Sequence, residues 1–390
     1  MNNIFLKKHK EESILRFHPW VFSGAIARIE GKPTDGELVC VRDYNGNSLG
    51  VGHYQDSSIA VRILDFGTDH LNTDFFAVRI KHAWNLRQSL CLSRADNDTF
   101  RLLHGEGDFL PGLIVDIYND TAVMQAHSAG MHLVRNQIAN TIAEIVPQVK
   151  NVYYKSESTL PLTKNFSDIK DEYLIGSAGS CLAKENGLVF SIDWLHGQKT
   201  GFFVDQRENR SLLEKYSYNR NVLNMFCYTG GFSVYALRGG AKLVHSVDSS
   251  EKAIELVNAN VSINFNDDNR HTAFVDDAFH FLSEAQEYDL IILDPPAFAK
   301  HRAAINNALQ GYKRLNYKAI EKIKHNGLLF TFSCSQTVSK EAFRLAVFSA
   351  AAMAKRRVRI LHQLSQPQDH PINIYHPESE YLKGLVLYVE

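Results

Sequence analysis

The sequence predicts an α/β protein in which a mostly parallel sheet follows a smaller β-rich module. Two apolar runs enclose a glycine turn and a helix, which predicts a strand–helix–strand unit over 222–248. Further apolar runs, each followed by a polar residue, continue that alternation to the end of the chain. By contrast, residues 1–72 carry short alternating runs at close spacing, which are typical of a small barrel. We therefore expect a Rossmann-like carboxyl-terminal domain preceded by a β-barrel, with an α+β domain over 73–183 between them.

Composition sets the class of protein and narrows its partners. The chain has 390 residues, 45% hydrophobic and 22% charged, as in ordinary globular proteins of two or three domains. Its net charge of −1 gives no global positive field, so any face that binds RNA must be a local patch. The five cysteines stand singly, without metal-ligand spacing, which predicts a reducing compartment and no metal centre. With no apolar leader and no long apolar run, we expect a cytoplasmic protein without membrane contact.

The turn between the first two strands of this unit predicts a nucleoside site. Tyr228-Thr229-Gly230-Gly231 links the first strand to a helix, and Asp248 ends the second strand about 20 residues later, where an acid suits a ribose diol. The glycine pattern that cradles a pyrophosphate is absent, and bulky Phe226 and Tyr228 stand where bare amides would be needed. We therefore expect S-adenosylmethionine (SAM) at Phe226, Tyr228, Gly230 and Asp248, and disfavour a nicotinamide oxidoreductase.

A second candidate cofactor segment precedes this unit. Residues 197–210 are polar, charged and aromatic with two glycines, which is unusual for a plain loop. We interpret the segment as a flap over the cofactor, with Gln198, Thr200, Phe202 and Asp205 as cofactor residues. The alternative is a charged helix entry in which Asp205 caps a helix beginning at Gln206.

Polar residues also follow three later strands of the predicted sheet. Asp277 follows the strand 272–275, Asp294 follows 288–293, and Cys334 follows 327–333. Open parallel sheets bind ligands at the carboxyl ends of their strands. We expect Asp277 on the adenine side of the cofactor, with Asp294 and Cys334 beside the reacting centre and Asp294 also bordering the cofactor.

Asp294 and Cys334 indicate different reactions. Asp294-Pro295-Pro296 is a rigid turn of the kind used to methylate exocyclic amines, although Ala297 replaces the usual aromatic residue and Phe298 comes one place later. Cys334 favours methylation of cytosine at carbon 5, since a thiolate added to carbon 6 makes carbon 5 nucleophilic. The alternative for Cys334 is a buried core thiol, because free cysteine is among the most buried residue types.

Several long motifs together resemble the RlmI-type 23S ribosomal RNA cytosine-5 methyltransferases. The matching segments span nearly the whole chain: LRFHPWVFSGAIARIEG, LLHGEGDFLPGLIVD, HGQKTGFFVDQRENR, NMFCYTGGFSV, VDSS, DLIILDPPAF, LLFTFSCS and YLKGLVL. The resemblance implies a PUA RNA-binding domain over 1–72, a central α+β domain over 73–183, and a class I SAM-dependent methyltransferase domain with a seven-stranded sheet over 184–390. It also implies 23S ribosomal RNA of the large subunit as the partner.

By the same resemblance, Tyr228 and Gly230 line the cofactor, Asp248 takes the ribose hydroxyls, and catalysis falls to Asp294 and Cys334. Relatives often carry lysine where this chain has Ala297, a place that Lys300 could fill in space. Pro296 stands where other RNA cytosine-5 enzymes have a second cysteine, so the base that removes the carbon 5 proton is unidentified. The sequence leaves open a homodimer, an exocyclic-amine methyltransferase and a non-catalytic RNA-binding protein.

Overall fold

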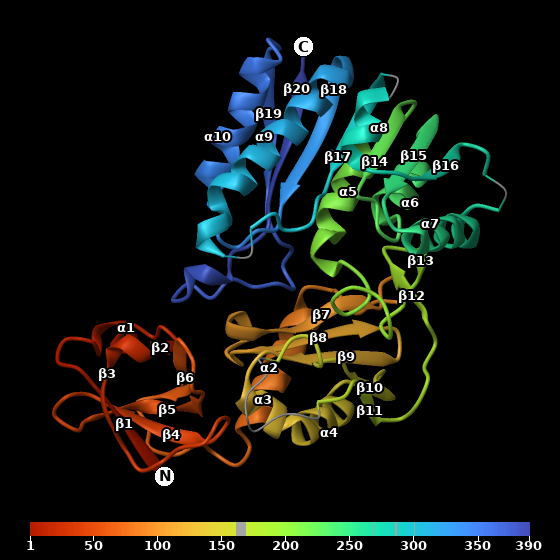
Figure 1. Cartoon of the computed structure of the whole chain (residues 1–390). Coiled ribbons are helices and arrows are strands. Elements are labelled where there is room, and N and C mark those ends of the chain that lie inside the picture. The colour runs from red at the N-terminus through yellow and green to blue at the C-terminus, as the bar shows by residue number, and fades with distance from the viewer. Residues whose placement is uncertain (161–168, 267, 285–286, 300) are drawn as a thin grey trace. The chain divides into compact units, whose positions relative to one another are not determined.

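The computed structural model describes the whole chain except residues 161–168, 267, 285–286 and 300, and except the side chain of residue 302. The chain forms two compact units (Figure 1). Unit 1 comprises 1–186, 192–204 and 368–379, and unit 2 comprises 187–191, 205–367 and 380–390. We describe each unit by itself. The predicted domain limits at 72 and 183 stay predictions.

The amino-terminal module of unit 1 is a six-stranded sheet in the order β2-β6-β5-β4-β1-β3. Residues Ile4, Val39, Val41 and Val61 belong to its buried core, as the alternating pattern predicts. Its elements are β1 (Asn2–Leu6), α1 (Glu12–Leu15), β2 (Trp20–Phe22), η1 (Ser23–Ala25), β3 (Ile26–Glu30), β4 (Leu38–Arg42), β5 (Ser48–Tyr54) and β6 (Ile59–Phe66).

The rest of unit 1 is built on a five-stranded sheet in the order β11-β10-β9-β8-β7. Helices α2 and α4 pack against each other and against strands of this sheet. The elements are α2 (Phe75–Ser89), β7 (Thr99–His104), η2 (Gly105–Asp108), β8 (Leu113–Tyr118), β9 (Thr121–Ala126), α3 (Ala129–Leu133), α4 (Arg135–Ile145), β10 (Asn151–Tyr154), β11 (Glu172–Ile175), β12 (Leu182–Glu185) and the late segment η5 (Pro377–Ser379).

Unit 2 contains a seven-stranded sheet in the order β16-β15-β14-β17-β18-β20-β19. The first five strands pair in parallel, whereas β20 is antiparallel to both β18 and β19. The strands of the sheet are β14 (Asn221–Met225), β15 (Leu243–Asp248), β16 (His271–Val275), β17 (Tyr288–Leu293), β18 (Ile323–Ser333), β19 (Val358–Leu364) and β20 (Lys383–Val389). The mostly parallel sheet predicted from the sequence is therefore confirmed.

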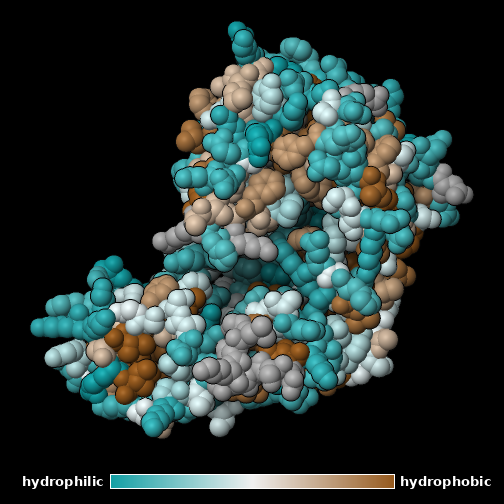
Figure 2. All heavy atoms as spheres, in the orientation of Figure 1, coloured by the Kyte–Doolittle hydropathy of each residue, from teal (hydrophilic) through white to brown (hydrophobic). Residues whose placement is uncertain are grey.

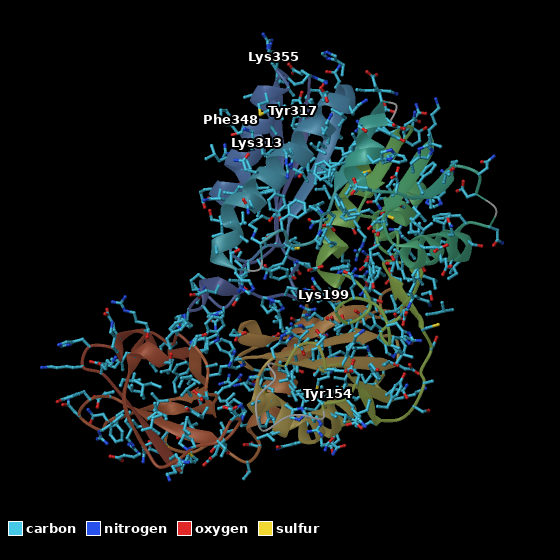
Figure 3. The ribbon with its side chains drawn as sticks, viewed as in Figure 1. Tyr154, Lys199, Lys313, Tyr317, Phe348 and Lys355 are labelled. Carbon is cyan, nitrogen blue, oxygen red and sulfur yellow. The ribbon has the colours of Figure 1, made fainter. Side chains whose placement is uncertain are left out.

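The helices of unit 2 form two packed groups, α5 with α6 and α7, and α9 with α8 and α10. Besides β13 (Leu188–Ser191), these elements are η3 (Val204–Gln206), α5 (Arg207–Tyr216), α6 (Gly231–Arg238), α7 (Glu251–Asn264), α8 (Ala278–Glu284), η4 (Arg302–Ala304), α9 (Ile305–Lys322) and α10 (Lys340–Met353). Figure 3 marks Lys313 and Tyr317 on α9 and Phe348 on α10. Leu293, Leu315 and Phe343 belong to one buried core of strand and helix residues.

Side-chain caps explain where two of these helices begin. The Ser250 hydroxyl accepts a hydrogen bond of 3.3 Å from the Ala253 N–H at the start of α7, and Ser339 caps α10 in the same way. The cap predicted at Asp205 is wrong. Helix α5 begins at Arg207 without a side-chain cap. The Asp205 carboxylate instead accepts a hydrogen bond of 2.6 Å from the Tyr381 hydroxyl, because η3 places Asp205 before the helix start.

The surface in Figure 2 is largely hydrophilic, with hydrophobic residues gathered in separate places. Among the residues that the structure describes, no helix is both long and apolar enough to cross a membrane.

Candidate active site

The turn after β14 is built from residues with left-handed backbone conformation. Phe226, Tyr228 and Gly230 have φ angles of 59°, 47° and 79°. Such angles are uncommon for residues with a side chain, and their clustering is typical of functional sites. A Cβ atom on Gly230 would lie 3.0 Å from Val257, so the turn packs closely onto α7. Asn260 of α7 donates a hydrogen bond of 2.8 Å to the Thr229 carbonyl and fixes the turn further.

Asp248 is held by the same turn. One carboxylate oxygen accepts a hydrogen bond of 3.0 Å from the Tyr228 N–H, and the other accepts one of 3.0 Å from the Ser250 N–H. Each oxygen keeps a second lone pair. A half-buried carboxylate fixed in this way, at the carboxyl end of β15, can accept hydrogen bonds from two neighbouring hydroxyls. The turn and Asp248 therefore fit the adenosine part of SAM.

Cys227 and Asp277 complete the surroundings of this edge. Burial, and next the charge of Asp248, raise the pKa of the Cys227 thiol well above its ordinary value, so it stays a neutral, structural thiol. Asp277 follows β16, the neighbour of β15, and is exposed. One of its oxygens accepts hydrogen bonds from the N–H groups of Phe279 and His280, at 2.9 and 3.1 Å, at the start of α8. Asp277 therefore caps α8, and its predicted contact with the adenine of the cofactor stays a prediction.

Asp294 lies at the end of β17 and is bound by residues that the sequence did not single out. Gln206 Nε2 donates a hydrogen bond of 3.1 Å to Asp294 Oδ2. Asn209 Nδ2 donates one of 2.6 Å to Gln206 Oε1, which orients the Gln206 amide. Gln206 and Asn209 are both buried. Their spacing of three places them on neighbouring positions of one helical turn, a signal that could have paired them.

Cys334 is half-buried at the end of β18, the strand beside β17. Its Sγ atom lies 3.9 Å from the Pro295 carbonyl oxygen, so the structure brings the cysteine to the Asp294-Pro295-Pro296 turn. The flanking serines are held by one tyrosine. Ser333 Oγ donates to the Tyr312 hydroxyl at 2.9 Å, and Ser335 Oγ lies 3.0 Å from the same hydroxyl. These contacts fix the backbone on both sides of Cys334.

Lys383, the first residue of β20, was missed in the sequence. Its side chain is buried, and its Nζ atom donates a hydrogen bond of 2.7 Å to the Ser335 carbonyl. Burial lowers the pKa of the Lys383 ammonium to about 8, and the charge of Cys334 acts in the opposite direction. An electrostatic interaction is mutual, so the Lys383 ammonium favours the thiolate form of a nearby cysteine.

The predicted flap is divided between the units. Gln198, Thr200 and Phe202 belong to unit 1, and Asp205 belongs to unit 2. Gln198 is exposed, whereas Thr200 and Phe202 are buried. The Thr200 hydroxyl donates to Asp116 at 2.6 Å and lies 2.8 Å from the Tyr118 hydroxyl, so this threonine has a structural role. The cofactor role of all four stays a prediction.

Two further features concern this flap and the Asp294 turn. The Lys199 ammonium lies 4.5 Å from the centre of the Phe203 ring. Figure 3 labels Lys199. Ala297 is half-buried after the double proline. Lys300, the residue expected to replace the lysine of relatives, lies outside the described residues.

Comparisons with known proteins show what this chain is similar to. A family model described as S-adenosylmethionine-dependent methyltransferase matches residues 164–372, and a PUA-like domain matches 4–66. "Ribosomal RNA large subunit methyltransferase I" of Tolumonas auensis is 39% identical, covering 98% of each chain. Two solved structures cover 100% of both chains at 23% identity: a candidate SAM-dependent methyltransferase from Streptococcus mutans, with a TM-score of 0.86, and the candidate methyltransferase SMU.776 complexed with SAH, with a TM-score of 0.87.

The fold and the two family models define a SAM-dependent methyltransferase with an amino-terminal PUA-like domain. The two solved structures support the fold alone, since their identity is low. The curated relative and the family models go further. The chain belongs to the ribosomal RNA large subunit methyltransferase I family, and its cofactor is SAM.

Proposed function

We propose that this enzyme methylates carbon 5 of a cytosine in 23S ribosomal RNA through a covalent adduct with Cys334. The names of the curated relatives support ribosomal RNA of the large subunit as the substrate. The choice of carbon 5 rests on the position of the Cys334 thiol, which lies 3.9 Å from the Pro295 carbonyl oxygen in the turn after Asp294. The next residue, Ser335, accepts a hydrogen bond from Lys383. A nucleophile, a carboxyl group and a cation meet at one sheet edge, as addition to a pyrimidine ring requires.

The reaction begins with a cytosine turned out of its stack into this pocket. The Cys334 thiolate forms a bond to carbon 6, and the electron pair of the ring double bond moves to carbon 5. Carbon 5 then takes the methyl group, whose transfer SAM makes possible because its sulfonium sulfur is a good leaving group. Loss of the carbon 5 proton restores the double bond and breaks the bond to sulfur, which releases the Cys334 thiolate. The protein base that accepts that proton is left unassigned.

Each nearby side chain has a defined part in this scheme. Asp294 acts in its protonated form: one oxygen accepts the hydrogen bond from Gln206, and the carboxyl O–H donates to ring nitrogen 3, which draws electrons away from carbon 6. Lys383 stabilises the thiolate. On the cofactor side, Asp248 binds the ribose hydroxyls, Asp277 the adenine, and Phe226, Tyr228 and Gly230 line the pocket. Gln198, Thr200, Phe202 and Asp205 belong to the proposed flap.

The experiment is to compare Cys334→Ala with wild-type enzyme on 23S ribosomal RNA. We expect loss of 5-methylcytosine, measured by mass spectrometry of digested RNA, with SAM affinity unchanged in calorimetry. RNA carrying 5-fluorocytosine should trap wild-type enzyme covalently, because fluorine cannot leave as the proton does, and should not trap the variant. Cys181→Ala is the matched control, since Cys181 is exposed. Normal turnover by the Cys334 variant would exclude the covalent mechanism.

A second candidate is methylation of an exocyclic amine, which the rigid Asp294-Pro295-Pro296 turn favours. In amine methyltransferases of this type an aromatic ring after the prolines stacks on the flipped base. Here the Phe298 ring packs on Tyr312, with ring centres 4.7 Å apart, and so contributes to the core. That packing supports the cytosine reaction. A methyl group found on nitrogen in the digested RNA would decide for the amine instead.

A third alternative is a protein that binds RNA without catalysis. Failure of SAM to bind in calorimetry would support it. A homodimer and a cytoplasmic location stay predictions. Sedimentation of the full chain with and without RNA tests the first of these.

A further inference from the structure

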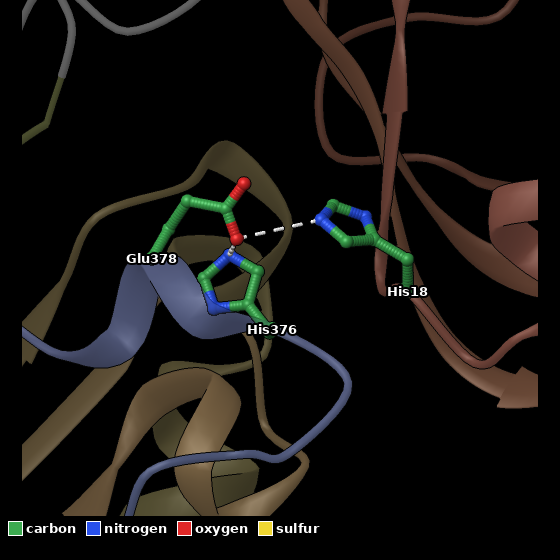
Figure 4. A group of neighbouring side chains, drawn as sticks. All are labelled: His18, His376 and Glu378. Carbon is green, nitrogen blue, oxygen red and sulfur yellow. Dashed lines mark ion pairs between the residues drawn. The ribbon is translucent and has the colours of Figure 1, made fainter.

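His18, His376 and Glu378 form a cluster inside unit 1 (Figure 4). His18 precedes β2 of the amino-terminal module, and the other two residues belong to the late segment around η5. Glu378 Oε2 lies 3.6 Å from His18 Nε2 and 3.7 Å from His376 Nε2. All three candidate ligand atoms lie within 4.8 Å of one another.

The His376 ring supplies the second observation. His376 is 1% exposed, so its ring is out of contact with solvent. Among the described residues, its buried Nε2 atom has no hydrogen-bond partner. A buried polar atom in that state carries a cost of about 1–3 kcal/mol unless something binds it. This atom faces Glu378 and His18, which indicates a ligand between the three side chains.

The other ring nitrogens have partners that suit metal binding. His376 Nδ1 lies 2.7 Å from the Ser379 hydroxyl. His18 Nδ1 lies 3.4 Å from the Trp20 carbonyl oxygen, which accepts its proton in one tautomer, and 3.2 Å from the Trp20 N–H, which donates to it in the other. A histidine that binds a metal through one nitrogen almost always donates the other N–H to an oxygen, since that bond sets the tautomer and the ring orientation. The His376 ring can therefore present a lone pair at Nε2, and the His18 ring presents one in the tautomer whose Nδ1 proton faces the Trp20 carbonyl.

We propose that His18, His376 and Glu378 bind a divalent transition metal ion, with zinc as the best fit. Two imidazoles and one carboxylate are a common zinc ligand set. Tetrahedral zinc, with bonds of about 2.0–2.1 Å, places its ligand atoms about 3.3 Å apart. The two distances to Glu378 exceed that value by less than 0.5 Å. A water molecule or a phosphate oxygen of RNA would take the fourth position.

Such an ion would join the PUA-like module to the segment 374–379 of the same unit. The two parts already meet through the Trp20 and His376 rings, whose centres are 4.2 Å apart. Trp20 also donates a hydrogen bond of 2.8 Å to Glu106. The metal would add bonds between residues from opposite ends of the sequence, and would therefore fix the RNA-binding module in one position. The site is independent of the methyl transfer proposed above.

The test uses the full chain without a histidine tag, stripped of metal with a chelator. We expect one zinc ion per chain in calorimetry and a rise in Tm on adding zinc, but no heat on adding magnesium, which prefers oxygen ligands. Cobalt in place of zinc should give the visible absorption of a site with nitrogen and oxygen ligands.

Three variants locate the ion. Glu378→Gln keeps the size of a half-exposed side chain, and it should weaken zinc binding by at least about tenfold, as should His18→Asn and His376→Gln. His82→Ala, on the exposed face of α2, is the control and should bind zinc normally. Circular dichroism and SAM titration show which variants are folded. No zinc binding by wild type, or equal binding by wild type and folded Glu378→Gln, would show the cluster to be an ordinary ion pair.

Discussion

The Lys383 ammonium donates a hydrogen bond of 2.7 Å to the Ser335 carbonyl, the residue that follows Cys334. This bond joins the start of β20 to the end of β18 and brings a buried cation to the proposed nucleophile. A thiolate is the reactive form of cysteine, and a nearby cation stabilises it. Two predictions follow from this single side chain, one for turnover and one for stability.

Replacing Lys383 with methionine should lower the rate of methyl transfer by about tenfold or more near neutral pH, since the thiolate is then less populated. The difference in rate between wild type and variant should become smaller as the pH rises, because the Cys334 thiol then ionises without the Lys383 charge. SAM affinity should stay unchanged. Single-turnover rates from pH 6 to 10 measure this, with Lys383→Arg as the control that keeps the charge. A methionine variant with the wild-type pH profile would contradict a role in activating Cys334.

The same substitution should change the dependence of stability on pH. Because burial lowers the pKa of Lys383 from 10.5 to about 8, the unfolded chain binds more protons than the folded chain between these values. The free energy of unfolding of the wild type should rise with pH across that window, by at most about 3 kcal/mol. Lys383→Met should lack this rise. Urea titrations at pH 7, 8, 9 and 10, followed by circular dichroism, measure the free energy of unfolding of both proteins. The contributions of other titrating groups cancel in the difference between wild type and variant.

The sequence was a good guide to the sheet and a poorer guide to the site. Alternating apolar runs locate strands because each strand must bury one or both faces, so β14 to β20 could be recognised from local pattern. Lys383 carries no such signal. Its importance comes from burial beside Cys334, nearly fifty residues earlier, on an antiparallel neighbour whose pairing no local pattern reveals.

Contacts between residues far apart in the sequence also explain why the partners of Asp294 and His18 could not be predicted. Gln206 binds Asp294 across 88 positions of sequence, and the binding depends on how α5 sits against the sheet. His18 and His376 come from opposite ends of the chain, so the expectation of no metal centre, which rested on cysteine spacing, could not take them into account. Thr200 shows the same limit, because its hydroxyl binds Asp116 and Tyr118 of the central sheet, contacts over more than 80 positions that the composition of its own segment does not predict.

Replacing Gly230 with alanine should weaken SAM binding by about tenfold or more. A left-handed conformation costs a residue with Cβ about 1–2 kcal/mol, and the added atom would press on Val257 at 3.0 Å. Calorimetry measures the affinity. Gly46→Ala is the control, because Gly46 also has a positive φ of 93° but has open space around it, far from the turn in sequence. If both variants bind SAM like the wild type, the turn after β14 does not hold the cofactor.

Replacing Gln206 with leucine should separate catalysis from cofactor binding. The variant keeps the volume of the side chain but removes the donor that reaches Asp294 at 3.1 Å. A hydrogen bond to a neutral carboxyl group contributes about 0.5–1.5 kcal/mol, so kcat should fall by roughly two- to tenfold if the Asp294 carboxyl group donates to the flipped cytosine. The KM for SAM should change little, because Gln206 is expected to position Asp294 alone.

The variant has one structural side effect that the design must separate. Leucine also leaves the buried Asn209 amide without the acceptor that it has at 2.6 Å, which destabilises α5 by about 1–3 kcal/mol. Asn209→Ala is the control, because it removes that donor and leaves the bond from Gln206 to Asp294 in place. We expect Asn209→Ala to lower Tm with a smaller effect on kcat. Equal losses of kcat in the two variants would mean that α5 acts through stability, and that Asp294 needs no positioning by Gln206.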